Sequence, residues 1–280
     1  MGLVVNTNTT AMSAHSTMSV NKTKTQKSME KLSSGFRINR AADDASGLGI
    51  SQKMRLNITV LDTYDKNTED GVSLVQTAEG AMAEISEMLK RGNELSLKAA
   101  NGVLDDSERG VLQNEVDELI DEIDRISVTS NFNGIRLFAE KNPNAAGSSN
   151  ADIVINSGEA SAGKLYIKLP ELSSEKLGID KVKINSLDTV NNAIDSFKAA
   201  LEIVSFERGS LGSYQNRMEY VSDSVVLTAE NLSSTKSRIS DTDYAQEMVN
   251  FASKNILSEA AQSMYAQANT STNSVLSLLQ

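Results

Sequence analysis

Residues 190–239 read VNNAIDSFKAALEIVSFERGSLGSYQNRMEYVSDSVVLTAENLSSTKSRI, and their spacing of apolar residues predicts the architecture of the chain. Every seventh position in this stretch is apolar: Val190, Phe197, Val204, Leu211, Met218, Val225, Leu232 and Ile239. An unbroken seven-residue repeat keeps one face of a helix apolar and favours left-handed supercoiling against a partner helix. At a rise of 1.5 Å per residue, such a helix is roughly 75 Å long. The repeat therefore predicts a rod that needs other helices beside it.

Earlier segments supply candidate partners for this rod. A similar repeat, interrupted only by Thr68, begins at Met54 and ends at Leu89. It predicts a helix over about residues 50–101, because Asn101–Gly102 is a helix stop followed by a turn. Apolar residues spaced by three and four predict another helix over about residues 107–127, which Asp105, Asp106 or Ser107 can cap.

Residues 139–188 differ in character from both flanks. They contain the two prolines of the chain, Pro143 and Pro170, and alternating runs at 152–156 and 164–169, which predict short strands in β-hairpins. Long helices joined by short connections lie antiparallel. We therefore expect a mainly α fold: a long antiparallel, coiled-coil-like helical bundle, or rod, with a small central β-hairpin region and the N- and C-termini paired at one end.

Each end of the chain predicts one further helix. Residues 3–35 carry a weak amphipathic pattern rich in Ser, Thr and Asn, and a capping signal at 240–243 precedes the last helix. From Ala260 to Gln280 the sequence has no charged side chain. A solvated helix normally carries charge, and an exposed apolar stripe marks an interaction surface.

This uncharged tail can pack in two ways, either against residues 3–35 of the same chain or against other copies of the protein. Two thin amphipathic helices paired alone leave apolar surface uncovered, so we favour contact with other copies. The residues expected to mediate this self-assembly are Ile256, Met264, Val275, Leu276, Leu278 and Leu279.

Composition argues against several classes of function. The formal net charge of −10 disfavours binding to nucleic acid or to an anionic membrane surface. No apolar run approaches the roughly 18–20 residues of a membrane span, and the N-terminus lacks the pattern of a cleavable signal peptide. Because the chain has no cysteine and one histidine, His15, we expect no catalytic, cofactor-binding or metal site. We interpret the carboxylate pairs Asp43–Asp44 and Asp105–Asp106 as helix caps.

Several blocks of the chain resemble bacterial flagellin. Near the N-terminus, Leu32–Asn39 (LSSGFRIN) and Ala42–Gly47 (ADDASG) match a flagellin signature. Further matching blocks follow in the family's order: Asp70–Ala81, Glu122–Ile126, Phe132–Gly134, Arg208, Leu211–Gly212, Gln215–Arg217 with Glu219, Asn231–Leu232, Ser237–Ile239 and Val275–Gln280. The resemblance covers residues 1–138 and about 188–280.

The resemblance implies a structural subunit, not an enzyme, that polymerises with itself into the flagellar filament used for swimming. Residues 1–45 and 241–280 are then expected to form the inner filament-core domain. Residues 46–240 are expected to form the rod, with helices at about 50–101, 107–127 and 190–239 and hairpins at about 139–188. The short middle leaves no outer variable domain.

Partners and location follow from the same resemblance. Besides other copies of the chain, the implied partners are the flagellar export machinery with its chaperone, and the hook-associated and cap proteins. The expected location is the extracellular flagellum, which the protein reaches by secretion without a cleavable signal peptide.

Two other functions compete with this one. A hook–filament junction protein resembles flagellin at both ends, but the ending Val275–Leu279 is similar to that of flagellin proper. A secreted adhesin without a role in motility requires a large central insert, which this chain lacks.

Flagellins are also ligands of the innate immune receptor Toll-like receptor 5, and the resemblance extends to that site. The matching stretch is Leu89–Leu95, with Gln113–Glu115 on the facing helix. The residues that this match assigns to receptor contact are Arg91, Leu95, Glu115, Leu89 and Lys90. The alternative for Arg91 is an ordinary solvated helix face.

Within this stretch, Lys90, Gly92 and Asn93 depart from the residues usual in the family. A glycine inside an exposed helix costs about 1 kcal/mol relative to alanine. We therefore expect receptor binding to survive and signalling to be weakened.

Overall fold

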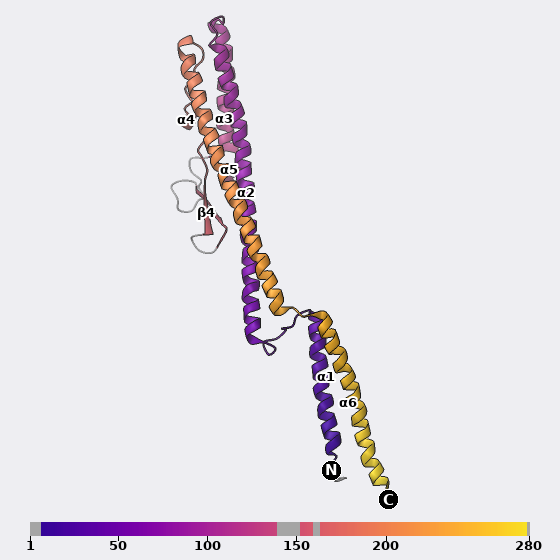
Figure 1. Ribbon diagram of the computed structural model, residues 1–280. Coiled ribbons are helices and arrows are strands. Elements are labelled where there is room, and N and C mark those ends of the chain that lie inside the picture. Colours follow the sequence, from indigo (N-terminus) through magenta and orange to yellow (C-terminus); the bar gives the residue numbers. More distant parts are fainter. Residues whose placement is uncertain (1–6, 139–151, 159–162, 279–280) are drawn as a thin grey trace. The chain divides into compact units, whose positions relative to one another are not determined.

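The computed structural model describes residues 7–138, 152–158 and 163–278, and side chains only as far as Ser271. Within these residues the fold is mainly α with two small antiparallel hairpins, which confirms the predicted fold class (Figure 1). In chain order the elements are α1 (Thr9–Ser34), α2 (Ala45–Ala99), α3 (Asp106–Thr129), β1 (Asn131–Phe132), β2 (Ile135–Arg136), β3 (Asp152–Asn156), β4 (Lys164–Lys168), α4 (Ser174–Leu177), α5 (Leu187–Ser240) and α6 (Tyr244–Leu278).

The chain forms two compact units, which we describe separately. The terminal unit comprises residues 1–59 and 229–280, and the central unit comprises residues 60–228. Within the described part of the chain, none of the helices combines the length and the apolarity needed to span a lipid bilayer.

The predicted seven-residue repeat forms the core of the central unit. Five successive members on α5, from Val190 to Met218, are at most 2% exposed. Their counterparts on α2, from Val75 to Leu89, are completely buried in the same apolar cluster. Thr68, the polar member of the α2 repeat, is also buried, and its hydroxyl donates to the carbonyl of Tyr64 at 2.8 Å. A buried hydroxyl that finds a partner within its own helix avoids the penalty for an unpaired polar group.

Helix α3 adds a third apolar face to this core through Leu112, Val116, Ile120 and Ile123. Asp105 is its N-cap, in a reciprocal capping box with Glu108, so the predicted cap is confirmed.

Arg109 ties the start of α3 to the end of α2. Its Nε donates to the carbonyl of Ala99 at 3.1 Å and its Nη1 pairs with Asp106 at 2.8 Å. The side chain of Arg109 thus satisfies a carbonyl that the end of α2 leaves without a helical partner, and places a cation at the negative end of the helix dipole.

The central hairpin packs on the rod with one face. Strands β3 and β4 pair antiparallel from Asp152 opposite Lys168 to Asn156 opposite Lys164. Along β4 the burial alternates, and Leu165 and Ile167 enter the core. Hydrophobic-in, polar-out alternation is what a sheet with one solvated face requires.

The chain then returns to α5 along a segment that α3 holds by its backbone. The carboxylate of Asp124 accepts hydrogen bonds from the amide and the hydroxyl of Ser174 at 2.7 and 2.6 Å. The side-chain amide of Gln113 accepts from the N–H of Ile184 at 2.5 Å and donates to the carbonyl of Val182 at 3.2 Å. Two polar side chains of α3 therefore satisfy backbone groups in a segment with little secondary structure of its own.

The burial of one glycine on α2 differs from the expectation based on the sequence. Gly92 was expected on an exposed helix face, but it is buried, and the ring of Phe197 lies against it. A Cβ atom built at Gly92 is 2.6 Å from Cε1 of Phe197, which is closer than packed carbon atoms approach. The missing side chain is what lets a large aromatic residue of the α5 repeat seat against α2.

The terminal unit is built on the pairing of α1 with α6. The amide of Asn8 donates to the carbonyl of Ala268 at 3.0 Å, and Lys254 donates to the hydroxyl of Ser28 at 2.8 Å. These contacts run in opposite directions along the two helices, so α1 and α6 are antiparallel and the chain ends lie at one end of the pair, as predicted (Figure 1). His15 is exposed and its ring lies 5.7 Å from that of Tyr265.

The packing at Gly92 predicts an effect opposite in sign to helix propensity. Gly92→Ala is expected to lower the free energy of unfolding by about 1–3 kcal/mol, because the added methyl group overpacks the contact with Phe197. Gly80 lies on the same helix with open space around it, so Gly80→Ala is expected to raise the free energy of unfolding by about 1 kcal/mol. Urea unfolding followed by circular dichroism measures both, and equal effects of the two substitutions contradict the proposed contact.

Candidate assembly surface and connector

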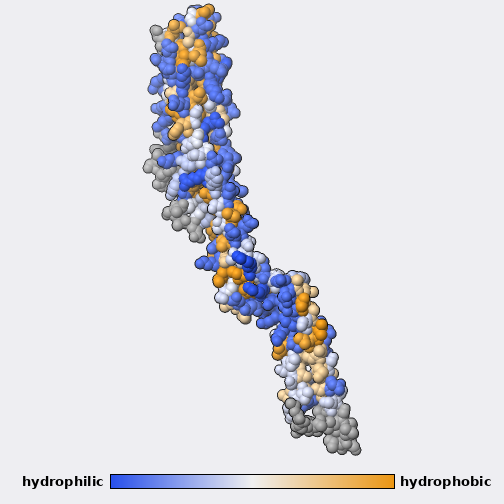
Figure 2. Space-filling view, viewed as in Figure 1, coloured by the Kyte–Doolittle hydropathy of each residue, from blue (hydrophilic) through white to orange (hydrophobic). Residues whose placement is uncertain are grey.

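The pair α1–α6 is packed through small residues and presents its large apolar residues to solvent. Among the described side chains, the buried residues of the two helices are the small residues Ala11, Ser28, Ala261 and Ala268, together with Glu247. The large apolar side chains lie outside, and we refer to these exposed residues as the assembly surface: Met12, Val20 and Met29 of α1, with Met248, Val249, Ile256, Leu257 and Met264 of α6. Pale and apolar residues are prominent over this pair in Figure 2, whereas blue dominates over the central unit.

Charge is nearly absent from the outer face of α6. The helix carries three charged residues, Glu247, Lys254 and Glu259. Lys254 lies 4.0 Å from Glu247 and donates to Ser28 of α1, so two of these charges are engaged at the helix pair. An apolar surface of this kind, without interspersed charge, is typical of a protein interface and is rare on the solvated face of a monomer.

The structure places two of the predicted self-assembly residues on this surface. Ile256 is 65% exposed and Met264 is 62% exposed. The side chains of Val275, Leu276 and Leu278 and the whole of Leu279 lie outside the described residues. Of the residues expected to mediate self-assembly, the structure therefore places Ile256 and Met264 on this surface, and of these two Met264 belongs to the uncharged tail.

Beyond α1, the flagellin-like signature forms a connector that pairs with the α5–α6 connection. Gly35 closes α1 in the left-handed conformation, with φ 74° and its N–H bonded to the carbonyl of Lys31. Phe36 then forms an antiparallel bridge with Asp241. On either side of that bridge, the N–H of Arg37 donates to the carbonyl of Ser240 at 2.7 Å and the N–H of Thr242 donates to the carbonyl of Gly35 at 3.0 Å.

Arg37 also acts through its side chain. Its Nη2 donates to the carbonyl of Ile239 at 2.6 Å, at the C-terminal end of α5. A cation that hydrogen-bonds the last carbonyls of a helix is favoured by the helix dipole. Residues of the flagellin-like signature therefore hold the segment after α1 against the connection between α5 and α6.

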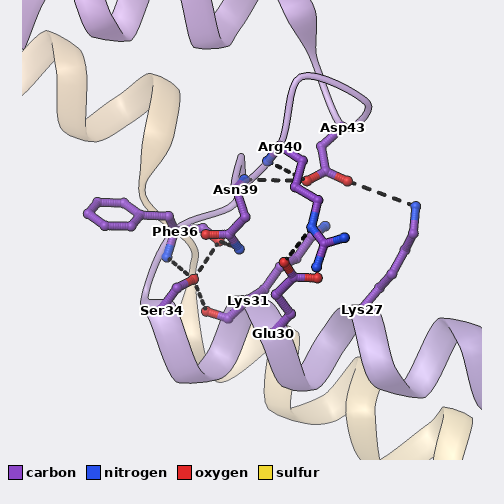
Figure 3. Close-up of polar contacts among 8 residues, drawn as sticks. All are labelled: Lys27, Glu30, Lys31, Ser34, Phe36, Asn39, Arg40 and Asp43. Carbon is purple, nitrogen blue, oxygen red and sulfur yellow. Dashed lines mark hydrogen bonds and ion pairs between the residues drawn. The ribbon is translucent and has the colours of Figure 1, made fainter.

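Asp43 holds the turn that leads into α2 (Figure 3). Its carboxylate accepts from the backbone N–H groups of Arg40 at 3.1 Å and Asn39 at 3.3 Å, and Lys27 lies 3.9 Å away. Arg40 in turn pairs with Glu30 of α1 at 2.9 Å. The hydrogen bond from the backbone of Arg40, with smaller contributions from Asn39 and Lys27, holds the pKa of Asp43 below its usual value of 3.8.

Asp44 caps α2, so the sequence-based interpretation of this carboxylate is confirmed. Its side chain accepts from the N–H of Gly47 at 2.9 Å and from the hydroxyl of Ser46 at 2.8 Å. The hydrogen bond from Gly47, followed by that from Ser46, lowers the pKa of Asp44. An N-terminal carboxylate of this kind also interacts favourably with the helix dipole.

The residues matched to receptor contact fall into two groups in the central unit. Arg91 of α2 and Glu115 of α3 are half-exposed and form a two-pronged ion pair, with Arg91 Nη2 and Nε at 2.7 and 3.0 Å from one carboxylate oxygen. This pairing with Glu115 raises the pKa of Arg91. Lys90 is also exposed and pairs with Glu87 on its own helix. Together these residues form a patch of fixed charges across α2 and α3.

The apolar residues of that group are placed differently from the expectation. Leu89 and Leu95 are 0% and 2% exposed and belong to the core, so they offer no side-chain surface to a partner in this fold. Gln113 is engaged with the backbone of Val182 and Ile184. The physical reason is packing: Leu89 and Leu95 lie in the apolar cluster to which α3 and α5 also contribute, whereas Arg91 and Lys90 remain exposed.

Among the described residues, no group of three or more His, Asp or Glu side chains is placed to hold a metal ion. Three features described above have functional potential: the assembly surface, the connector and the charged patch around Arg91.

The hydrogen bonds to Asp43 predict that the connector loses stability in acid when this carboxylate is protonated. Because its folded-state pKa lies below the unfolded value of 3.8, the carboxylate stabilises the fold above that value, and the contribution is lost as pH falls through the folded pKa. An NMR titration that follows the amides of Asn39 and Arg40 is expected to give a midpoint below 3.8. In Asp43→Asn that transition should vanish, whereas a wild-type midpoint at or above 3.8 contradicts the assigned hydrogen bonds.

Comparison with known proteins identifies the family. Residues 5–143 match the bacterial flagellin N-terminal helical region and residues 187–279 match the bacterial flagellin C-terminal helical region. A flagellin of Halalkalibacterium halodurans is 40% identical over 278 residues, covering 99% of this chain and 100% of the relative. A flagellar filament core protein of Brachyspira hyodysenteriae is 37% identical over 285 residues, with coverage of 99% and 100%.

Solved structures agree with these matches. The crystal structure of Bacillus cereus flagellin has a TM-score of 0.50 at 28% identity and covers 57% of this chain and 88% of that one. A putative flagellar hook-associated protein from Vibrio parahaemolyticus has a TM-score of 0.59, covers 71% of this chain and 100% of that one, and shares the fold at 14% identity. The helical order, the paired chain ends and the full-length similarity show that this chain belongs to the bacterial flagellin family.

Proposed function

We propose that this protein is a structural subunit that polymerises with itself into the extracellular flagellar filament and supports swimming. The observation that carries the proposal is the assembly surface, where large apolar side chains of α1 and α6 are exposed and where α6 carries only three charged residues along its length. The filament core proteins among its relatives are consistent with this role.

The physical mechanism is burial of the assembly surface between identical copies. Removing one large apolar side chain from water contributes about 1.5–3 kcal/mol. Contacts between different patches of identical subunits extend without closing when the rotation between neighbours does not form a ring, and they then generate a helical filament. In this scheme residues 1–45 and 241–280 form the filament core, and residues 46–240 form the surrounding rod without an outer variable domain.

A role as a filament subunit also implies particular partners. A subunit assembled outside the cell must pass through the flagellar export machinery with its chaperone, and must join hook-associated and cap proteins at the ends of the filament. These partners, and secretion without a cleavable signal peptide, belong to the proposal through the flagellin family. Full-length identity of 40% to a flagellin supports the filament subunit over the hook–filament junction, since the hook-associated neighbour shares 14%.

A second proposed activity is recognition by Toll-like receptor 5. The observation that favours it is the exposed Arg91–Glu115 ion pair, which joins α2 and α3 at positions matched to the family's receptor site. Leu89 and Leu95 belong to the core, so their role is to support the helices that carry this ion pair. The receptor therefore meets a paired guanidinium and carboxylate, with Lys90 beside them.

The assembly surface predicts which substitutions block polymerisation. Ile256→Lys with Met264→Lys is expected to raise the critical concentration for filament formation by at least about tenfold, because two charges replace apolar side chains that become buried. Sedimentation of polymerised protein measures this. The matched control is Ile256→Leu with Met264→Leu, which keeps the apolar character and should polymerise normally. If the lysine variant polymerises as the control does, this surface is not the interface.

The charged patch predicts a separable effect on receptor signalling. Arg91→Glu is expected to shift the dose response of receptor-expressing reporter cells by at least about tenfold, since buried arginine anchors contribute about 2 kcal/mol or more to interfaces. Arg125→Glu is the control, because Arg125 forms a similar exposed pair with Glu122 on α3. Unchanged signalling by Arg91→Glu, or an equal loss in the control, removes Arg91 from the receptor site.

A further inference from the structure

The sequence contains two Asn–Gly pairs, and the structure places them in very different turns. Asn101–Gly102 lies in the connection between α2 and α3, and Asn133–Gly134 lies between β1 and β2. Both asparagines are exposed. An asparagine followed by glycine can react with its own backbone, because glycine has no Cβ to obstruct the approach of its nitrogen.

We propose that Asn101 is a site of spontaneous deamidation and isomerisation, and that the fold protects Asn133 from the same reaction. The backbone nitrogen of Gly102 loses its proton to solvent and forms a bond to Cγ of Asn101. The Cγ–Nδ2 bond then breaks, and ammonia leaves with a proton from water, which closes a five-membered succinimide ring. Addition of water opens the ring at either carbonyl and yields aspartate or isoaspartate at residue 101. The net reaction consumes one water and releases one ammonia, without any oxidant or enzyme.

The geometry at Asn101 favours the attack. Its Oδ1 accepts a hydrogen bond from the N–H of Val103 at 3.3 Å. This side-chain turn holds the amide carbonyl over the peptide that contains the nitrogen of Gly102. The N–H of Val103 also withdraws charge from the carbonyl oxygen, as a hydrogen-bond donor does for an oxyanion. Apart from Gly102 and its two chain neighbours, no heavy atom lies within 4 Å of a Cβ position at Gly102, so residues elsewhere in the fold do not block the ring.

The geometry at Asn133 opposes attack by the backbone nitrogen of Gly134. Asn133 and Gly134 both have positive φ, at 50° and 81°, as a two-residue hairpin turn requires. Phe132 pairs with Ile135 on one side of the turn and Asn131 with Arg136 beyond it. Closing the ring requires rotation about the Cα–C bond of Asn133, and that rotation breaks the pairs that hold the turn.

Reaction at Asn101 has a structural consequence through Arg109. The main-chain carbonyl of Asn101 accepts from Nη2 of Arg109 at 3.4 Å, and Arg109 is only 6% exposed. Isoaspartate inserts a methylene group into the main chain and displaces this carbonyl. Both products also add a negative charge beside the C-terminal end of α2, where the helix dipole disfavours it. The site lies outside the assembly surface and does not depend on filament formation.

The test uses the intact protein, incubated at mildly alkaline pH in water enriched in ¹⁸O. Trypsin then separates the two sites, because one peptide spans residues 99–109 and another spans residues 126–136. Mass spectrometry with fragmentation that distinguishes isoaspartate should show labelled product accumulating at residue 101 at least several-fold faster than at residue 133. Equal rates, or a faster reaction at residue 133, overturn the proposal.

Two controls separate the chemistry from the fold. In concentrated urea, which unfolds the chain, the two sites should react at comparable rates, so a persisting difference would show that local sequence and not structure sets it. Gly102→Ala adds a Cβ next to the attacking nitrogen in open space. It should abolish most of the reaction at residue 101 and leave residue 133 unchanged. An undiminished reaction in that variant rules out the succinimide route.

Discussion

Along α5, the side chains of Phe197, Val204, Leu211 and Met218 are removed from water, and the other elements of the central unit are placed by that burial. Each side chain of this size contributes about 1.5–3 kcal/mol when it is fully buried. Helices α2 and α3, strand β4 and the returning segment all add apolar residues to the same cluster. Gln113 and Asp124 hydrogen-bond the backbone of the returning segment. These polar contacts fix the position of that segment, whereas burial of the apolar residues provides most of the stabilisation.

The terminal unit is packed differently from the central unit, because mainly small residues are buried between its helices α1 and α6. In the central unit the large residues of the seven-residue repeat point inward, although other large apolar residues, such as Phe206 and Tyr220, are exposed there. In α1 and α6 alanine and serine lie between the helices, and methionine, isoleucine and leucine face solvent. Small residues let two helices approach closely but bury little apolar area, so this pair gains less stability from its own packing than the central unit does. The uncovered residues are available for contacts between copies, which is the property that a self-assembling subunit needs.

Periodicity and short connections were sufficient to predict the long helices, the β3–β4 hairpin and the antiparallel pairing of the chain ends, because buried positions recur at the period of the element that carries them. The β1–β2 hairpin lies outside residues 139–188, where hairpins were expected. It was not sufficient at residues whose environment is set from another element. Gly92 has the local sequence of an exposed helix position, but it is covered by Phe197, more than a hundred positions away in the chain. Leu95 lies one helical turn after the exposed Arg91 and is nevertheless buried in the core. The sequence pattern assigned no role to Arg109 and matched Gln113 to the receptor site. Their contacts with the end of α2 and with the returning segment arise only from the tertiary structure.

Long helices and an uncharged tail were evident from the amino-acid sequence, and the signature blocks established the resemblance to flagellin. These are local properties, since a seven-residue repeat and a run without charge are readable without knowing what lies opposite them. Tertiary structure alone decided that the signature LSSGFRIN pairs with the α5–α6 connection through Phe36 and Arg37, and which apolar residues of α6 remain uncovered. Both depend on bringing residues about two hundred positions apart into contact, and no spacing within one segment encodes the partner that it will meet.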